Sequence, residues 1–253
     1  MDQPAARAAL GPYRVGPHGA GDLRGRPDGA DDAGRPVARH EGDCKVRLTH
    51  LLAGQARPIA AKSGLSGIFK TPCDGPVTIG AEGLAGDTIV DRDNHGGLEQ
   101  AVYLIGQPDL DWWAQELARP LPPGTFGENM VIGGLQTGPL GLGDIVQVGA
   151  ATLQITAPRI PCVTLSARMG DPGFARRFLA AGRPGAYARV RVPGIVQAGD
   201  AVSLSPAAGT RVTLTEVMDG LRQNWPDAEL LRRISATEAH AKLRAMAQER
   251  TAR

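Results

Sequence analysis

Apolar and polar residues alternate with the period of a β-strand in many short segments of this chain. The segments with a strand pattern are 45–52, 66–77, 101–105, 131–132, 145–149, 151–156, 185–192 and 199–204. Glycine and proline turns separate them, and their spacing is short and fairly regular. This arrangement favours an all-β barrel or sandwich over a parallel α/β sheet. We therefore predict a mainly β fold with a few peripheral helices.

Helical spacing of apolar residues is confined to two short segments and the C-terminal part of the chain. The short helices are expected at 108–117 and 171–182, and a small helical appendage is expected at 206–253. Residues 1–43 are rich in Gly, Pro, Ala, Arg and Asp and nearly free of large apolar side chains, which predicts a disordered leader. The β domain itself is expected to span 44–205.

Composition excludes several classes of function. The formal net charge is +2 and aromatic residues make up 4% of the chain, so neither a nucleic-acid partner nor a membrane surface is expected. The three cysteines are widely spaced and form no Cys-x-x-Cys pair, which argues against a disulfide framework and a structural zinc site. No apolar run reaches the length of a membrane span, and the N-terminus lacks the apolar core of a secretory signal. We expect a cytoplasmic protein.

The segment from Pro158 to Cys162 is the strongest candidate for chemistry. It follows the strand pattern of 151–156, and Pro158 and Pro161 fix the backbone at two of its five positions. A stiff loop of this kind can hold Cys162 at the rim of a sheet. Arg159 precedes the thiol by three residues and would favour the thiolate, which is both a nucleophile and a soft metal ligand. Alternatively, Cys162 is a buried apolar residue, as free cysteines commonly are.

Other candidate residues lie in polar, glycine-containing loops. His95 is followed by two glycines, and the first, Gly96, would let backbone approach a ligand closely. Lys70 is a candidate anchor for a phosphate or carboxylate, and Glu128 and Asn129 could orient a polar ligand. Structural alternatives exist for each: a surface histidine, a solvated lysine, and turn residues that satisfy backbone groups.

Several segments together resemble the MOSC family, the fold of the C-terminal domain of molybdenum-cofactor sulfurase, and in particular its small bacterial members with a C-terminal three-helix extension. The matching segments are Gly64 to Val77, Gly83 to Asp87, His95-Gly96-Gly97, Phe126 to Asn129, Gly143-Asp144, Pro158 to Cys162 and Tyr187 to Val190. The resemblance implies a MOSC-type β-barrel. It also implies a functional cysteine, here Cys162, that carries sulfur or ligates molybdenum in a bound molybdopterin.

The resemblance further implies roles for individual residues. Lys70, Arg92, Arg159 and Arg189 would meet the phosphate or pterin of the molybdenum cofactor. The residues expected to bind the cofactor are Lys70, Arg92, Gly96, Glu128, Asn129, Arg159 and Arg189. His95 and Asn129 are further candidates for the substrate side of the metal, and His95 or a bound water would supply a proton.

Similar bacterial proteins reduce N-hydroxylated compounds, so the expected substrate is a small molecule of that class. The chain contains neither a Gly-x-Gly-x-x-Gly motif nor clustered cysteines for an iron-sulfur centre. The resemblance therefore implies an external electron donor of the flavin or ferredoxin type.

Two other functions use the same residues. Cys162 could form a persulfide and act as a sulfur carrier, or the chain could be a non-catalytic module that binds molybdopterin. The sequence departs from the family pattern at Asn94, Gln100 and Ala157, where relatives commonly have histidine, lysine and glutamine. The natural substrate and the oligomeric state stay open.

Overall fold

The computed structural model describes residues 46–61, 64–92 and 94–252. The leader expected at 1–43 lies outside these residues, as does Cys44, and the leader stays a prediction. None of the helices in the described residues is long and apolar enough to cross a membrane.

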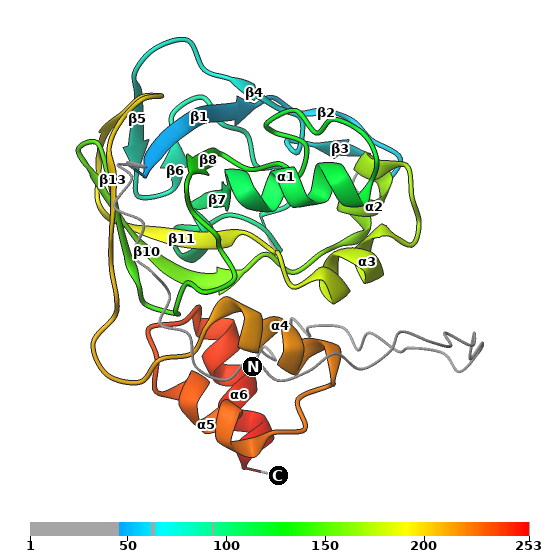
Figure 1. The fold of residues 1–253 in the computed structure, drawn as a ribbon, viewed down its shortest axis with the longest axis vertical. Helices are drawn as coiled ribbons and strands as arrows, with labels where there is room; N and C mark the ends of the chain where they lie inside the picture. Colours follow the sequence, from blue (N-terminus) through cyan, green and yellow to red (C-terminus); the bar gives the residue numbers. More distant parts are fainter. Residues whose placement is uncertain (1–45, 62–63, 93, 253) are drawn as a thin grey trace, which may run out of the picture. The chain divides into compact units, whose positions relative to one another are not determined.

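The central feature of the fold is an eight-stranded mixed sheet (Figure 1). Its strands, in spatial order, are β13 (Val202–Ser205), β9 (Ile145–Val148), β10 (Ala151–Pro158), β11 (Ala186–Val192), β7 (Val102–Gly106), β8 (Met130–Gly133), β1 (Arg47–Gly54) and β4 (Lys70–Pro72). All neighbours are antiparallel except β7 and β8, which run parallel. An isolated antiparallel bridge joins Arg47 of β1 to Ala201, next to β13. The mainly β prediction is confirmed, whereas closure into a barrel stays a prediction.

Short strands and helices complete the structure. A three-stranded sheet has the order β12 (Gly194–Val196), β5 (Val77–Gly80) and β6 (Gly83–Leu84). A two-stranded sheet pairs β2 (Arg57–Pro58) with β3 (Leu65–Ser66). The helices are η1 (Leu98–Gln100), α1 (Gln107–Glu116), α2 (Val163–Met169), α3 (Phe174–Ala181), α4 (Leu214–Arg222), α5 (Ala228–Ser235) and α6 (Ala241–Thr251). The expected helices at 108–117 and 171–182 correspond to α1 and α3. Helix α2 was not predicted, although the left-handed Gly170 that ends it is a recognisable C-cap signal.

Strand β10 is more deeply buried than its sequence pattern predicts. The pattern indicates a half-buried strand, yet seven of its eight residues are buried. The reason is its position, because β9 and β11 pair with its two edges and α4 packs against it. The strand ends at Pro158, as expected, and the chain then enters the loop that carries Cys162.

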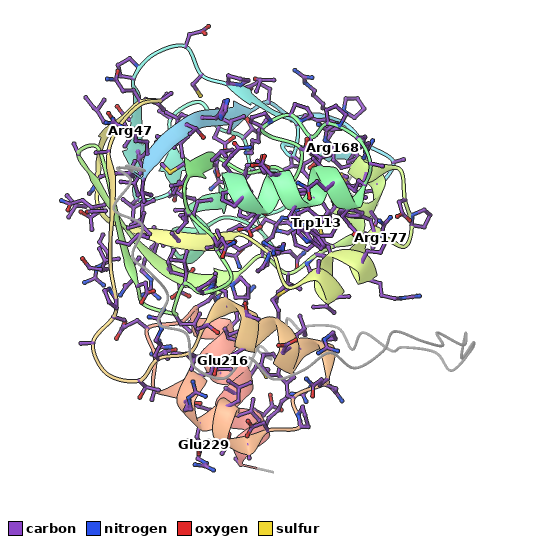
Figure 2. All side chains as sticks on the ribbon, in the orientation of Figure 1. Arg47, Trp113, Arg168, Arg177, Glu216 and Glu229 are labelled. Atoms are coloured by element: carbon purple, nitrogen blue, oxygen red, sulfur yellow. The ribbon has the colours of Figure 1, made fainter. Side chains whose placement is uncertain are left out.

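An aromatic cluster supports one side of the molecule. Trp113 of α1 is 1% exposed and stacks on Phe178 of α3 with ring centroids 5.4 Å apart. Phe126 and Phe174 lie with their ring centroids 5.7 and 5.3 Å from that of Trp113, which Figure 2 labels. The burial of Trp113 shows that it is a core-packing residue. The cluster matters for the site because Phe126 also lines the cavity described below.

The C-terminal helices α4, α5 and α6 form one group beside β10 (Figure 1). Their apolar residues, including Val217 and Ile234, belong to the same buried cluster as Leu153 and Ile155 of the sheet. Helix α4 begins with a capping box, in which the Thr213 hydroxyl accepts from a backbone N–H and the third helical residue reaches back. The helical character of the extension is confirmed; the division into domains at 205 and 206 stays a prediction.

Candidate functional site

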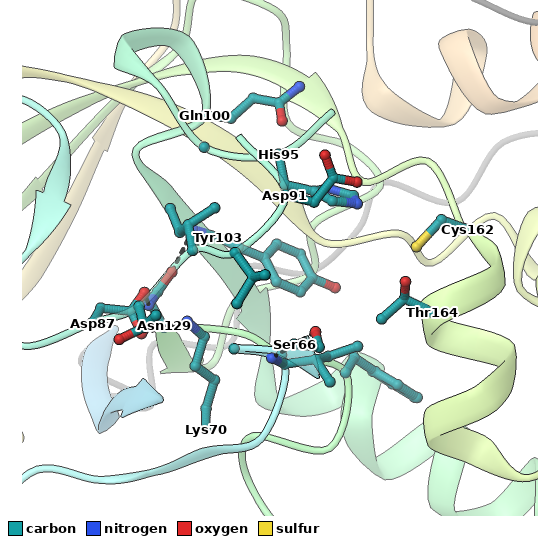
Figure 3. Close-up of a pocket in the computed structure, with 18 of the residues that line it drawn as sticks. Ser66, Lys70, Asp87, Asp91, His95, Gln100, Tyr103, Asn129, Cys162 and Thr164 are labelled. Carbon is teal, nitrogen blue, oxygen red and sulfur yellow. Dashed lines mark hydrogen bonds and ion pairs between the residues drawn. The ribbon is translucent and has the colours of Figure 1, made fainter. Parts of the chain in front are cut away.

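A cavity of about 90 Å³ opens where the loops after β3, β6 and β10 meet strands β4, β7 and β11. Cys162, His95 and Arg159 line it together, as do Lys70 and Asn129. Figure 3 shows the Cys162 sulfur on one side of this cavity and the group of Lys70 and Asn129 on the other. The fold therefore brings together residues that the sequence nominated from four separate segments.

Cys162 is half-buried and occupies the N-cap position of α2, with an extended backbone (φ −129°, ψ 172°). Burial alone would raise the pKa of its thiol. The hydrogen bond from His95, the positive charge of Arg159 and the Leu165 backbone N–H outweigh burial and lower the pKa to about 6. Cys162 is therefore largely a thiolate at neutral pH, and it is not the sealed apolar residue of the alternative interpretation.

Arg159 lies almost fully inside the protein at 3% exposure. Its guanidinium is 5.5 Å from the ring centroid of Tyr103 and 5.7 Å from that of Phe178, so aromatic faces hold it in place. Its Nη1 atom is buried and has no hydrogen-bond partner in the part of the chain that the structure describes. A buried cationic donor without a partner is costly, and a ligand oxygen in the cavity would satisfy it.

The loop that carries His95 is shaped by local hydrogen bonds. The Asp91 carboxylate accepts from the Asn94 side-chain amide at 3.2 and 3.1 Å, and the Asp91 carbonyl accepts from the His95 backbone N–H at 3.0 Å. Gly96 has φ +75°, and a Cβ there would lie 2.6 Å from Cδ1 of Ile89. Glycine is favoured at 96 mainly by this positive φ, which L side chains rarely adopt.

Lys70 lines the cavity, but its charge is already neutralised. Its ammonium forms a buried ion pair with Asp87, and the Asp87 carboxylate also accepts from the Gly54 backbone at 2.7 Å. Asn129 donates to Asp87 at 2.9 Å and accepts from the Tyr103 backbone N–H at 3.1 Å. Lys70 and Asn129 thus fix the cavity wall through contacts with the protein itself.

Three nominated residues do not line the cavity. Arg92 is exposed and pairs with the exposed Glu82 at 3.5 Å. Glu128 is fully buried and accepts from the Gly124 and Phe126 backbone N–H groups at 2.5 and 2.9 Å; burial raises the pKa of its carboxyl group although these N–H groups oppose the effect. Glu128 therefore shapes its turn.

Arg189 is the third. It pairs with Glu99 at 3.1 Å and donates to the Glu238 carbonyl at 2.9 Å, which ties the helical extension to the sheet. The charge of Arg189 therefore stabilises the contact between the sheet and the helical extension.

The structure also reveals cavity residues that sequence reasoning did not nominate. Tyr103 and Tyr187 lie side by side on β7 and β11, with ring centroids 5.3 Å apart. Tyr103 belongs to a strand that reads as fully apolar core, so its position in the cavity had no local signal. Gln100, at the end of η1, lines the cavity too, and the sequence had already singled it out as a departure from the family pattern. Its Oε1 atom is buried and has no partner among the described residues.

A cluster of arginines was also missed. Arg168 of α2 stacks on the ring of Phe69 at 4.7 Å, and its buried Nε atom has no partner within residues 46–61, 64–92 and 94–252. Burial lowers the pKa of Arg168, and the nearby positive charges of Arg119 and Arg57 lower it further. Arg57 pairs across β2 and β3 with Ser66, which lines the cavity.

Within the described residues, no three His, Cys, Asp or Glu side chains are grouped so that they could hold a metal ion. A metal at this site would therefore have to arrive with most of its own ligands, and the protein would add the Cys162 sulfur.

Comparisons with known proteins agree on one family. A sequence profile of the MOSC domain matches residues 91–203. The uncharacterized protein YflK of Bacillus subtilis is 31% identical over 178 residues, which cover 70% of this chain and 79% of YflK. A protein named "Reductase" from Gibberella moniliformis is 35% identical over 144 residues, which cover 55% of this chain but only 25% of that protein.

A solved structure supports the fold. YiiM from Geobacillus stearothermophilus superposes with a TM-score of 0.69 at 24% sequence identity, covering 81% of this chain and 99% of that chain. This likeness concerns the arrangement of the backbone.

Proposed function

Because this chain belongs to the MOSC domain family, we propose that it binds a molybdenum cofactor through Cys162 and reduces small N-hydroxylated compounds. The observation that carries the proposal is a single cavity in which the Cys162 thiol meets His95 and the unpaired Nη1 of Arg159. A thiolate, an imidazole that donates a hydrogen bond and an unpaired cationic donor suit a soft metal with anionic ligands.

The residues fit the cofactor chemically. Molybdopterin brings two dithiolene sulfurs, so one protein thiolate at Cys162 suffices and a three-residue metal site is unnecessary. The enclosed volume of about 90 Å³ is well below the roughly 300–1,000 Å³ of pockets that enclose a whole organic ligand. The cavity would therefore take the reacting groups, and most of the pterin would lie outside it.

The cations available to an anionic cofactor differ from those first nominated. Lys70 and Arg189 are paired with carboxylates, whereas Arg159 retains a free Nη1 atom. Arg159 would therefore hold an anionic oxygen of the bound cofactor. The cluster of Arg57, Arg119 and Arg168 is the candidate for the phosphate.

When bound, the cofactor would supply a redox-active metal for the two-electron reduction of the N–O bond. The protein's part is to hold Cys162 as a thiolate, through the His95 hydrogen bond and the Arg159 charge, and to supply a proton from the His95 imidazole. Asn129 positions the Tyr103 backbone, so its role is orientation of the wall.

The electrons come from a separate protein in this proposal, of the flavin or ferredoxin type. The match to the protein named "Reductase" covers 25% of that protein.

The test is the variant Cys162→Ala, compared with Cys73→Ala as the matched control thiol. Both proteins are purified after expression with molybdate, and molybdenum and pterin per chain are measured together with reduction of benzamidoxime by a chemical electron donor. We expect Cys162→Ala to lose molybdenum and activity while its thermal unfolding stays cooperative. Full activity in Cys162→Ala would refute the proposal.

A sulfur carrier is the second candidate, because the Cys162 thiolate is partly exposed and no grouped metal ligands engage it in the described residues. Incubation with a cysteine desulfurase and cysteine, followed by mass spectrometry, should then add one sulfur atom to Cys162 and none to Cys162→Ala. Absence of that sulfur on the wild-type protein would exclude the candidate.

A further inference from the structure

Gln100 lines the cavity, and its side chain contains a buried acceptor that has no donor among the described residues. Its Oε1 atom is buried and lacks a donor, and the residue lines the same cavity as Cys162. The other buried side-chain atoms without a partner in the described residues are arginine nitrogens, so this is an acceptor among donors. A buried amide oxygen that has lost water without gaining a donor is rare, and it calls for an explanation.

Flexibility of η1 does not explain the missing donor to the Gln100 oxygen. The neighbouring residue, Glu99, is held at both its carboxylate and its carbonyl: the carboxylate accepts from the Ala241 N–H at 2.8 Å and from Arg189 at 3.1 Å, and the carbonyl accepts from the Thr156 hydroxyl at 2.6 Å. These bonds fix η1 against β10, β11 and α6. Gln100 is thus held beside the cavity by the fold, in the manner of a group prepared for a ligand.

The cavity also contains the complementary group. Arg159 is 3% exposed and its Nη1 has no acceptor, so one cavity carries one unpaired acceptor and one unpaired donor. A ligand that satisfies both must present an N–H or O–H toward Gln100 and an oxygen or another acceptor toward Arg159.

The geometry points to Gln100 as the residue that selects substrates by accepting a hydrogen bond from their nitrogen-bound hydrogen. This inference rests on the proposed function and specifies its substrates. The preferred N-hydroxylated compounds carry an N–H group on the carbon that is bonded to the N–O nitrogen, as amidoximes do. Compounds whose neighbouring nitrogen is fully alkylated leave the Gln100 oxygen unsatisfied and are disfavoured.

The test uses two probes that differ only at that nitrogen, benzamidoxime and N,N-dimethylbenzamidoxime. Dissociation constants are measured by titration calorimetry, and kcat/KM is measured with a chemical electron donor. We expect the wild-type protein to favour benzamidoxime by about tenfold or more in both quantities. No detectable binding of either probe, or equal binding of both, would overturn the inference.

Two variants separate the hydrogen bond from the size of the pocket. Gln100→Leu keeps a similar volume and removes the acceptor, so the preference should fall to about threefold or less. Gln100→Glu retains acceptor oxygens and should keep the preference. Gln115→Leu, an exposed glutamine on α1, is the matched control and should behave as wild type. An undiminished preference in Gln100→Leu, or a preference lost equally in Gln100→Glu, contradicts an acceptor role.

The two proposals fail in different ways. If the wild-type protein reduces neither probe yet binds benzamidoxime selectively through Gln100, the reductase proposal fails and the inference on Gln100 stands. If the protein reduces both probes and Gln100→Leu leaves the selectivity unchanged, the inference fails and the reductase proposal stands.

Discussion

The ionisation of Cys162 gives the sharpest prediction. In a Cys44→Ser, Cys73→Ser background, Cys162 is the remaining thiol, and its alkylation by iodoacetamide reports the thiolate. Because the pKa is lowered to about 6, the rate should rise with pH through a midpoint near 6 and then level off. Replacing His95 by Ala removes the hydrogen bond and the charge that lower the pKa, so the midpoint should move to higher pH.

The size of the effect determines what should be measured. At pH 7 a thiol of pKa about 6 is roughly 90% ionised, whereas one of pKa 9.0 is about 1% ionised. A thiolate of lower pKa is also a weaker nucleophile. With a Brønsted coefficient of about 0.45, a pKa lower by three units reduces the intrinsic reaction rate of the thiolate roughly twentyfold, which offsets most of the gain in ionisation. The net acceleration at pH 7 is then only about fivefold. The midpoint is therefore the decisive quantity.

The same ionisation also affects folding. The folded pKa lies below the ordinary value, so the thiolate stabilises the fold at pH above about 9, and this contribution is lost as pH falls toward 6. A pKa lowered by about three corresponds to on the order of 4 kcal/mol. Urea unfolding at pH 6 and pH 9, compared with Cys162→Ser in the same background, measures it. A midpoint near 9 in the alkylation profile, or one unchanged in His95→Ala, would refute the reasoning.

Three further perturbations test the structure around the site. Lys70→Met leaves Asp87 buried without its partner, so the free energy of unfolding should fall by about 3–5 kcal/mol in urea titrations; a loss below about 1 kcal/mol would mean that the pair is solvated. Trp113→Ala removes the centre of the aromatic cluster and should cost about 3–5 kcal/mol by the same assay, and a much smaller loss would show that the cluster refills the space. Glu99→Gln weakens the acceptor for the Ala241 N–H, so hydrogen exchange at that amide should accelerate relative to wild type; unchanged exchange would remove Glu99 from the junction between the sheet and α6.

Some of the site could be predicted because its signals are local. The prolines at 158 and 161 stiffen a loop whatever the rest of the chain does, and the strand before them follows from alternation along six residues. His95 and Cys162 were nominated from such short segments, and the structure places both in one cavity. Their hydrogen bond could not be predicted, because it depends on the approach of two loops.

Which cations stay free to bind a ligand was decided by tertiary contacts. Lys70 and Arg189 are of residue types that commonly bind anions, yet ion pairs with Asp87 and Glu99 neutralise their charges. Arg159 instead is enclosed by aromatic rings that offer no acceptor to its Nη1 atom.

The sequence by itself determined the mainly β character of the chain and the helical C-terminal region, and it nominated Cys162 as the candidate for chemistry, since each of these depends on neighbours within a few positions. The tertiary structure decided the ionisation of Cys162, the pairing of the cations and the place of Gln100 at the cavity. These properties are set by electrostatic and hydrogen-bond partners that lie far away along the chain, and folding alone brings them within reach.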